Sequence, residues 1–372
     1  MAKNLTIEDI ARLAGVSRTT VSRVLNHRPD VDRDTRARVL RVIDEHSYIP
    51  SLTAAGLAGG RNRLIGMLLP TFTWPIIADL VRGITEILKQ TSYELVLYTF
   101  DDEDLSRDRR VVINRLLATR LAAGFLAVFP GPQLSAQLTE LYDQGVPVVI
   151  IDDQQEQATP WVRADNVTGA YEAVRHLIRL GHRRIAHIQG PSEYLASHDR
   201  HQGYLWALAE AGIEPEADLI LSGDFLPRSG YVSAVRLFEL PAVRRPTAIF
   251  AAADQMAYGV LRAAEERGLA VPEQVAVVGF DDDAPSAHVH PPLTTVHQPS
   301  LEMGREGIRL LLAALAASDD QGGDLEASQA DGRAAPARVV LPTTLVVRAS
   351  CGAPASTVAK TVAAADIWPS AE

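Results

Sequence analysis

Four polar side chains fall on the outer face of one short predicted helix near the N-terminus: Arg18, Thr19, Ser22 and Arg23. Arginine donates paired hydrogen bonds to a guanine edge, and hydroxyl groups bond to bases or to phosphates. Gly15 precedes this helix, where a tight turn from an earlier helix is expected. Two short helices joined in this way form a helix-turn-helix, whose second helix enters the major groove of DNA. The residues therefore predict sequence-specific contact with DNA.

Three short helices are expected to position these side chains. The first runs from about Ile7 to Leu13, after Thr6 as N-cap and with Asp9 at the spacing of a capping box. The second carries the polar face, and the third runs from near Asp32 to near Ser47. Tyr48-Ile49-Pro50 ends the third helix, because the residue before a proline is pushed out of the helical region. Residues 1–50 are therefore predicted to form a small helical head.

The charge of the chain is divided unevenly. Residues 1–63 contain eleven Lys and Arg against seven Asp and Glu, a net charge of +4, whereas the whole chain carries −10 and the remainder therefore −14. Phosphate binding needs positive charge at the contact, whatever the total. Contact with a polyanion is thus expected at the N-terminal end only.

Length and composition limit which domains and which class of protein the rest of the chain can form. With 372 residues, 47% of them hydrophobic, the chain can bury full cores in two or three domains. A single cysteine, Cys351, excludes a disulfide framework and is expected to be an exposed thiol beside a disordered tail. The first residues contain no apolar signal region, and no later apolar run reaches the length of a membrane span. We expect a cytoplasmic, nucleoid-associated protein.

From Leu64 onward, apolar runs alternate with amphipathic helical stretches such as Ile76–Gln90 and Gly169–Leu180. Continuous apolar strands between helices are typical of parallel sheets covered on both faces. The pattern predicts an α/β body of two doubly wound parallel-sheet lobes with a ligand crevice at the strand carboxyl ends. The predicted strands are Leu64–Leu69, Leu95–Phe100, Gly124–Phe129, Val146–Ile151, Ile185–Ile188, Ala248–Ala252 and Val275–Phe280.

The connecting segments are less regular. Residues 51–62 are rich in Ala and Gly and are expected to be a linker, or a hinge helix that forms only when docked. A helix is predicted from Leu301 to Ala317, and residues 318–336 form a low-complexity surface excursion. A strand is expected at Val339–Val347, and residues 350–372 are predicted to be a disordered tail. The first lobe should then comprise about residues 63–164 and 297–318, and the second about 165–293 and 338–349.

From about Leu5 to Arg348, the chain resembles the lactose-repressor/galactose-repressor (LacI/GalR) family of bacterial transcription regulators. The resemblance rests on several stretches taken in order. They are Thr6–Ala11 with Ala14–Ser17, Thr20–Asn26, Tyr48–Pro50, His176–Ala186, Val277–Asp282 and Pro291–Val296. The resemblance implies a homodimer whose paired heads read a near-palindromic operator, and a periplasmic-binding-protein-like body that binds a small-molecule effector.

The resemblance also implies which head residues contact DNA. Leu57 matches the hinge leucine that wedges into the minor groove, where an apolar side chain kinks the duplex. Gly56 departs from the family, which often has a larger polar or basic residue there. The implied DNA-binding residues are Thr6, Ser17, Arg18, Thr19, Thr20, Ser22, Arg23, Asn26, Tyr48, Ala54 and Leu57.

In the body, the resemblance places effector contacts at the strand ends that face the crevice. Arg200 matches an arginine that donates to paired ligand hydroxyls, and Asp281 matches an acceptor carboxylate. Thr71 and Ala253 stand where sugar-responsive members often carry Asp and Asn. The implied effector residues are Thr71, Phe72, Trp74, Ile76, Arg200, Ala253, Asp281 and Gln298.

Two classes of effector remain open. Arg200 and Asp281 suit a polyhydroxylated ligand, so a carbohydrate or its derivative is the first expectation. A nucleobase or nucleoside is the alternative, because Trp74 and Phe72 offer aromatic faces for a flat ring, unless they belong to the core.

An enzymatic body or a sugar-binding body without a regulatory role is a more distant alternative. Asp281-Asp282-Asp283 with His288 and His290 lacks any recognised metal-ligand spacing, and no Gly-x-Ser-x-Gly or phosphate-binding glycine motif is present. We therefore expect no enzyme activity, no metal and no cofactor.

Overall fold

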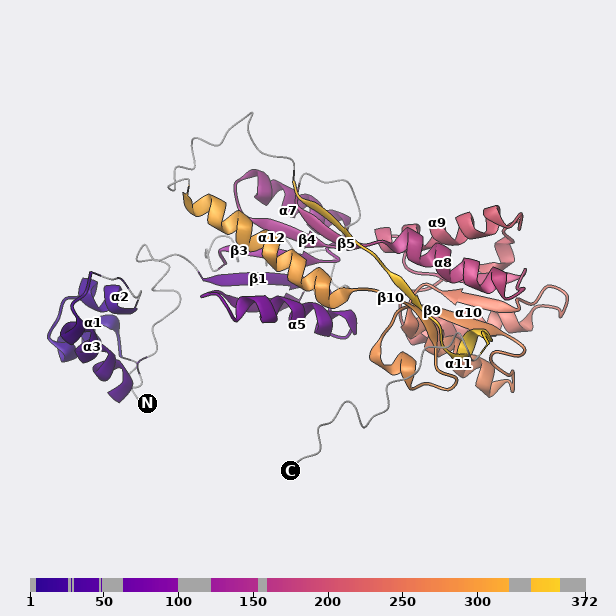
Figure 1. The fold of residues 1–372 in the computed structure, drawn as a ribbon, viewed down its shortest axis with the longest axis horizontal. Coiled ribbons are helices and arrows are strands. Elements are labelled where there is room, and N and C mark those ends of the chain that lie inside the picture. The colour runs from indigo at the N-terminus through magenta and orange to yellow at the C-terminus, as the bar shows by residue number, and fades with distance from the viewer. Residues whose placement is uncertain are drawn as a thin grey trace, which may run out of the picture. The chain divides into compact units, whose positions relative to one another are not determined.

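The computed structural model describes residues 5–25, 28, 30–46, 48, 63–99, 122–152, 159–320 and 336–354. The chain divides into two compact units, an N-terminal head and a body that begins at Leu64. The predicted hinge at 51–62 lies outside the described residues, as do most of the excursion at 318–336 and the tail beyond Pro354. Figure 1 shows the described elements of each unit.

The described part of the head contains three helices, α1 (Ile7–Ala14), α2 (Arg18–Leu25) and α3 (Arg33–Glu45). Thr6 and Asp9 form the predicted capping box at the start of α1, with the Asp9 backbone N donating to Thr6 Oγ1 at 3.3 Å. Gly15 adopts a φ of 66°, the left-handed conformation that a tight turn to α2 requires. Apolar side chains from all three helices meet in a small core. Local capping and this core together fix the orientation of α2.

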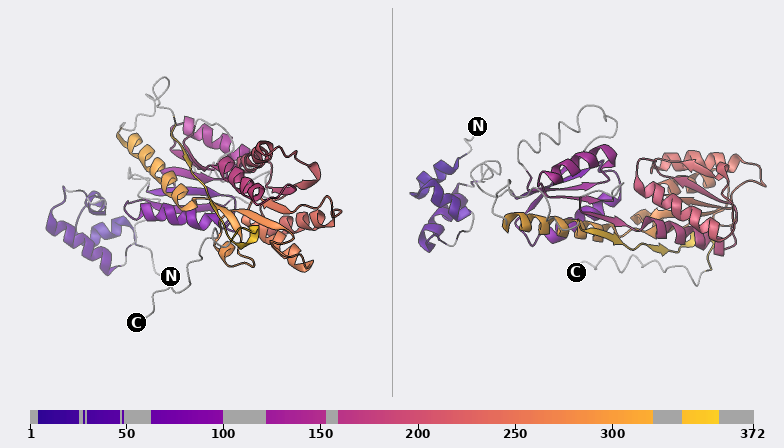
Figure 2. Two further views of the ribbon diagram at one scale, coloured as in Figure 1. Left: turned by 45° about the vertical axis from the view of Figure 1, so that its right-hand side comes forward. Right: turned by 90° about the horizontal axis from the view of Figure 1, so that it is seen from above.

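The first lobe of the body is built on a sheet in the order β11-β5-β4-β3-β1-β2. All its described strand pairs are parallel. The strands are β1 (Leu64–Leu69), β2 (Glu94–Thr99), β3 (Gly124–Val128), β4 (Val148–Ile151), β5 (Trp161–Ala164) and β11 (Arg338–Leu341). Helices α5 (Ile76–Leu88) and α12 (Ser300–Asp320) pack together, and Figure 2 shows α7 (Gly131–Asp143) on the face opposite α12.

Glycines permit the close approach of α5 and α12. A Cβ at Gly83 would lie 2.1 Å from the Leu301 carbonyl oxygen, and one at Gly304 would lie 2.3 Å from that of Leu80. Any larger residue would push the two helices apart. The packing therefore joins residues near position 80 to the segment that follows residue 300.

The second lobe is built on a sheet in the order β12-β10-β9-β8-β6-β7, in which only β12 runs antiparallel among the described pairs. The strands are β6 (Ile185–Gln189), β7 (Ile220–Ser222), β8 (Ala248–Ala251), β9 (Ala276–Asp281), β10 (Thr294–His297) and β12 (Thr344–Val346). The helices are α8 (Asn166–Arg179), α9 (Leu195–Glu210), α10 (Pro227–Glu239) and α11 (Asp254–Glu266).

Both faces of this second sheet are covered by helices. Phe250 and Val278 pack with α8 and α9, while their neighbours Ile249 and Val277 pack with α10 and α11. Successive strand residues point to opposite faces, so two helical layers require strands that are apolar throughout. The predicted class, an α/β body of two doubly wound lobes behind a helix-turn-helix head, is confirmed.

The C-terminal strand differs from the prediction. The expected single strand at Val339–Val347 is two strands, because β11 pairs with β5 of the first sheet and β12 with β10 of the second. Pro342 interrupts the run and lacks the N–H that a continuous ladder needs. The interval 338–349, expected in the second lobe, is therefore divided between the two sheets.

The first residues of the predicted tail are also ordered. A 3₁₀ turn spans Ala349–Cys351, and Ser350 Oγ donates to the Val277 carbonyl oxygen at 2.6 Å. Cys351 is buried at 1% exposure, with its Sγ 3.3 Å from His176 Nε2. The expectation of an exposed thiol is wrong, because this turn is bonded to β9 of the second sheet and Cys351 packs in the adjoining core.

Candidate functional site

The outer face of α2 presents the predicted DNA contacts. Arg18, Thr19 and Arg23 are exposed, and Ser22 is partly buried. The Arg18 guanidinium lies 3.1 Å from Glu8 Oε1, and that of Arg23 lies 3.4 Å from Asp30 Oδ2. Exposed ion pairs of this kind are weak, so both arginines can exchange their partners for phosphates or bases.

The remaining head residues divide into supporting and undescribed positions. Ser17 Oγ accepts from the Thr20 backbone N at 3.1 Å, which makes Ser17 the N-cap of α2. Tyr48 packs against the head core. The other three predicted contacts, Asn26, Ala54 and Leu57, lie outside the described residues.

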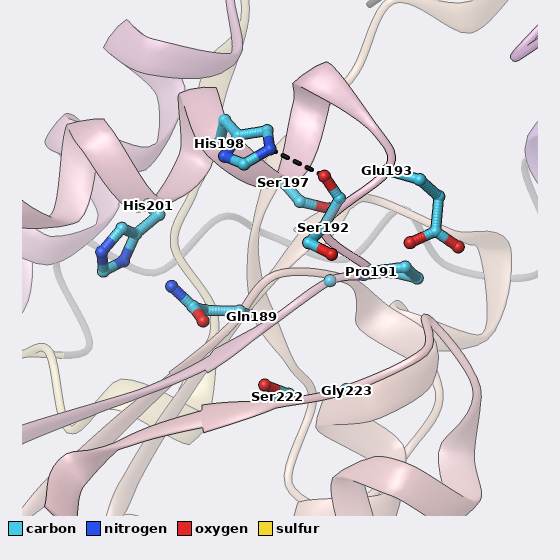
Figure 3. Close-up of a pocket in the computed structure, with 10 residues that line it drawn as sticks. Gln189, Pro191, Ser192, Glu193, Ser197, His198, His201, Ser222 and Gly223 are labelled. Atoms are coloured by element: carbon cyan, nitrogen blue, oxygen red, sulfur yellow. Dashed lines mark hydrogen bonds between the residues drawn. The ribbon is translucent and has the colours of Figure 1, made fainter. Parts of the chain in front are cut away.

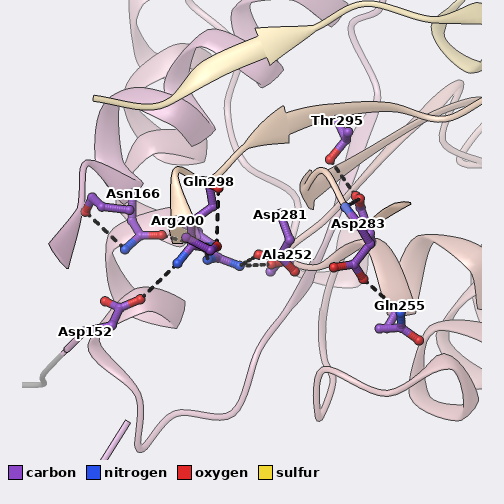
Figure 4. A network of polar contacts seen from close by, with 12 residues as sticks. Asp152, Asn166, Arg200, Ala252, Gln255, Asp281, Asp283, Thr295 and Gln298 are labelled. Atoms are coloured by element: carbon purple, nitrogen blue, oxygen red, sulfur yellow. Dashed lines mark hydrogen bonds and ion pairs between the residues drawn. The ribbon is translucent and has the colours of Figure 1, made fainter. Parts of the chain in front are cut away.

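The centre of the body site is Arg200 on α9, which is 4% exposed. Its Nε donates to Asn166 Oδ1 at 2.9 Å, and its terminal nitrogens donate to Gln298 Oε1 at 2.8 Å and to the Ala252 carbonyl oxygen at 2.5 Å. One terminal nitrogen also lies 3.2 Å from Asp281 Oδ1. Figure 4 shows these partners converging on the guanidinium from different strands and connections. A buried cation satisfied on so many sides is held in one orientation.

Phe280 supports the guanidinium from one side. The Arg200 Cζ atom lies 3.7 Å from the centre of the Phe280 ring. Stacking on an aromatic face stabilises a desolvated guanidinium and restricts its position. The planar set of N–H donors on the Arg200 guanidinium, called the donor fork below, therefore has a fixed orientation.

The chain passes between the two sheets beside this arginine. Asp165 connects β5 to α8, and Gln298 follows β10 before α12. Gln298 Nε2 in turn donates to Asp152 Oδ2, at the end of β4, over 3.4 Å. The network therefore joins strand ends of both lobes.

Two carboxylates in the network titrate far from their ordinary range. Burial raises the pKa of Asp281 to about 7, and nearby Arg200 only partly opposes this. Burial likewise raises the pKa of Asp152 to about 6. Each is able to accept a hydrogen bond when ionised and to donate one when protonated.

Residues with strained, positive φ angles lie at or shortly after the same strand ends. Phe129, Asp152, Phe225 and Asp281 have φ values of 47°, 59°, 63° and 115°, in the region that normally favours glycine. Such conformations cost about 1–3 kcal/mol each and cluster at binding sites. They are consistent with a ligand site at this edge.

Aromatic rings form a second part of the site. The Trp74 ring centre lies 5.4 Å from that of Phe129, 5.8 Å from that of Tyr194 and 6.3 Å from that of Phe225, all in edge-to-face geometry. We call Trp74, Phe129, Tyr194 and Phe225 the aromatic cluster. It combines rings from both lobes.

The other predicted effector residues are placed less centrally. Phe72 is 57% exposed, whereas Thr71 is partly buried and its Oγ1 accepts from the Thr73 backbone N at 3.2 Å. Ile76 begins α5, and Ala253 is buried at the start of α11. Arg200, Asp281 and Gln298 are thus brought together, while Phe72 lies apart from the cluster that includes Trp74.

Sequence reasoning missed several residues of the site. Asp152 directly follows the predicted strand Val146–Ile151, and Phe129 is the last residue of the predicted strand Gly124–Phe129, so the strand-end rule was a signal that would have found both. Asn166, Tyr194 and Phe225 lie in connections or at helix starts, where the sequence carries no comparable signal.

A separate carboxylate supports the adjoining turn. Asp254 is fully buried and accepts from Thr295 Oγ1 at 2.5 Å, from Ser286 Oγ at 2.6 Å and from the Asp283 backbone N at 2.9 Å. Burial raises the pKa of Asp254 well above its ordinary value. These bonds fix the turn that follows Asp281.

Two further features are absent from the described residues. No helix in these segments is both long and apolar enough to span a membrane. Within the same segments, no group of three or more His, Cys, Asp or Glu side chains is arranged to hold a metal ion.

Comparison with known proteins gives a consistent result along the chain. Residues 6–51 match the model for bacterial regulatory proteins of the lacI family, and residues 174–351 match a periplasmic binding protein-like domain. The regulator CelR of Thermobifida fusca is 35% identical over 361 residues, which cover 93% of this chain and 98% of CelR. The chain belongs to the lacI family.

Other members of the family are similar over most of their length. The repressor PurR of Haemophilus influenzae is 34% identical over 318 residues, which cover 85% of this chain and 92% of PurR. A structure of a CelR–cellobiose complex matches 93% of this chain and 99% of its own, with 34% identity and a TM-score of 0.68. The lac repressor dimer bound to operator and the anti-inducer ONPF matches 94% and 100%, with 29% identity and a TM-score of 0.79. This lacI-family protein is therefore a DNA-binding transcription regulator with an effector-binding body.

Proposed function

We propose that this regulator binds a near-palindromic operator as a homodimer, represses transcription there, and releases or tightens its hold when a carbohydrate occupies the crevice. The Arg200 network is the observation that supports a carbohydrate as the effector. A flat donor fork lies beside the carboxylates of Asp281 and Asp152 and the amide of Gln298. Adjacent ligand hydroxyls offer both donors and acceptors, which this mixture of groups matches.

The aromatic cluster supports a ligand with at least one sugar ring. Trp74 and Phe225 belong to different lobes, and their ring centres are 6.3 Å apart. The apolar face of a sugar ring packs on aromatic side chains, while its hydroxyl edge reaches polar groups. Among the relatives, CelR was solved with cellobiose, so a disaccharide is the first ligand to test.

A nucleobase is the second candidate. The aromatic cluster also suits a flat heterocycle, and PurR repressors are among the relatives. A nucleobase has no hydroxyl groups and would therefore use fewer of the hydrogen-bond donors and acceptors around Arg200. The carbohydrate therefore remains the preferred effector.

The proposed control is a shift between two arrangements of the lobes. An effector that binds one arrangement more tightly favours that arrangement, which alters how the paired heads meet two half-sites. Head residues Arg18, Thr19, Ser22 and Arg23 would read base edges or the neighbouring phosphates. We propose no catalytic role, and we expect the protein in the cytoplasm on the nucleoid.

Thermal unfolding of the full chain with cellobiose, D-glucose, guanine and hypoxanthine tests the effector class. We expect cellobiose to raise the unfolding temperature in proportion to the logarithm of its concentration. Arg200→Lys keeps the charge but loses the planar fork, so it should abolish this shift, while the exposed control Arg262→Ala should retain it. Stabilisation by the nucleobases alone would refute the carbohydrate assignment.

A further inference from the structure

The second lobe contains a polar pocket of about 330 Å³ at the carboxyl ends of β6 and β7. Its walls come from Gln189 to Glu193, from Ser222 and Gly223, and from Ser197, His198 and His201 on α9. Figure 3 shows these side chains around the opening. The volume falls in the range of about 300–1,000 Å³ that is usual for small-molecule sites.

This pocket is distinct from the Arg200 network. Neither Arg200, Asp281 nor Gln298 contributes to its walls. Gly190 separates the pocket from the aromatic cluster, because a Cβ at Gly190 would lie 2.2 Å from the Phe225 ring and 2.5 Å from Ser197 Oγ. The pocket and the aromatic cluster therefore adjoin at Gly190.

The pocket is built by facing positions on a helix and a strand. Ser197 and His201 are four residues apart on α9 and therefore share one helical face. His187 and Gln189 alternate on β6 and share one face of that strand. The His187 and His201 rings stack with centres 5.5 Å apart and planes 5° from parallel.

Three polar atoms in or next to the pocket wall have no partner among the described residues. Ser197 Oγ, His201 Nδ1 and His187 Nε2 are buried and form no hydrogen bond with any described residue. His187 Nδ1 lies 3.1 Å from the Phe250 carbonyl oxygen, which can only accept, so Nδ1 carries the hydrogen and Nε2 is a free acceptor. Ser197 is 4% exposed. Buried polar groups are nearly always bonded, so these atoms indicate a partner from outside the chain.

The lining is almost uncharged. It contains no Lys or Arg, and Glu193 is its only carboxylate. Burial lowers the pKa of His201, which keeps that imidazole neutral near pH 7. An anion would find no Lys or Arg here, whereas hydroxyls, an amide and the neutral His201 imidazole supply both donors and acceptors.

We propose that this pocket binds a small uncharged polyhydroxylated ligand, a monosaccharide or polyol, at a site separate from the effector crevice. Ser197 and His201 would bond its hydroxyls, and Gln189 would bond at the base of the pocket. His198 donates from Nε2 to the Ser192 carbonyl oxygen at 2.7 Å and so holds the loop that forms one wall.

Saturation-transfer NMR on the full chain tests the proposal, with methyl β-D-glucopyranoside and glycerol as probes. We expect at least one probe to receive saturation from the wild type and from Arg200→Lys, because Arg200 does not line the pocket. The double variant S197A/H201F keeps the ring stack but removes both polar atoms. It should bind that probe about tenfold more weakly, because two hydrogen-bonding groups of a buried site are lost.

Matched variants separate this result from misfolding. Trp206→Phe changes the exposed face of α9, where Trp206 is 55% exposed, and should bind like the wild type. If the double variant unfolds in a thermal melt, Gln189→Leu replaces it and should weaken binding in the same way.

Three outcomes would overturn the proposal: neither probe binds the wild type, binding disappears in Arg200→Lys but survives in the pocket variants, or inorganic phosphate displaces the bound probe. The proposed regulatory function is measured on operator DNA, so its success or failure is independent of all three.

Discussion

A terminal nitrogen of the Arg200 guanidinium, whose side chain is 5% exposed, lies 3.2 Å from Oδ1 of Asp281, whose side chain is 20% exposed. The pair carries opposite charges that are both costly to bury, and each compensates the other. Asn166, Gln298 and the Ala252 carbonyl oxygen accept further hydrogen bonds from the arginine. The proposed effector site is therefore a preorganised polar network, and its parts depend on one another.

Removing the arginine should destabilise the body strongly. Arg200→Ala leaves Asp281, Asn166 and Gln298 without their shared donor, and we expect the free energy of unfolding to fall by about 3–5 kcal/mol. The matched control is Arg262→Ala, whose ion pair with Glu266 is exposed and should contribute less than about 1 kcal/mol. Urea unfolding of the two variants measures the difference. Equal losses would show that the Arg200 network does not hold the lobe together.

Stability should also depend on pH through Asp281. Its folded-state pKa is about 7, whereas the ordinary value is 3.8, so between these values the folded protein keeps a proton that the unfolded chain releases. The free energy of unfolding contributed by Asp281 is therefore fully present below about pH 4 and is lost as the pH rises through about 7.

Asp281→Asn removes this proton uptake. Between about pH 4 and 7, the free energy of unfolding of the Asp281→Asn variant should therefore fall less steeply with rising pH than that of the wild type. The two slopes should differ by up to about 1.4 kcal/mol per pH unit. Chemical unfolding across the window measures the two slopes. Parallel curves would mean that the folded-state pKa of Asp281 is close to its ordinary value.

The head should read sequence through α2. Replacing Arg18 or Thr19 with Ala should reduce affinity for the preferred operator by about 1–3 kcal/mol per lost base contact, with a smaller effect on unrelated DNA. Arg82→Ala is the control, because Arg82 is an exposed arginine of the body paired with Asp79. Fluorescence anisotropy on operator and scrambled duplexes measures both affinities. An equal loss on the two duplexes would assign Arg18 to phosphate contact alone.

Much of the fold was predictable because apolar runs specify buried strands. β1 was predicted with its observed bounds, and β3 and β9 within about one residue at each end. Strands β5, β7 and β10 have only three or four residues, so their local pattern is too short to distinguish from a loop. The division of residues 339–347 between two sheets depends on tertiary pairing, although Pro342 marked the break.

The site was predictable in part for a different reason. Arg200, Asp281 and Gln298 were named from the family resemblance, and the structure brings all three into contact through Arg200. Asp152 and Phe225 were missed because their proximity arises from chain connections far apart in sequence. The buried Cys351 was missed because the residues after the last strand carry no apolar pattern that would reveal their docking.

Operator binding measured with and without cellobiose tests effector control of DNA binding most directly. We predict that saturating cellobiose changes the affinity of the wild-type chain for its operator by about 5- to 150-fold, the usual range of allosteric coupling. Arg200→Lys should bind the operator with wild-type affinity and show no response to the sugar. An operator affinity that is the same with and without cellobiose, guanine and hypoxanthine would contradict effector control through this crevice.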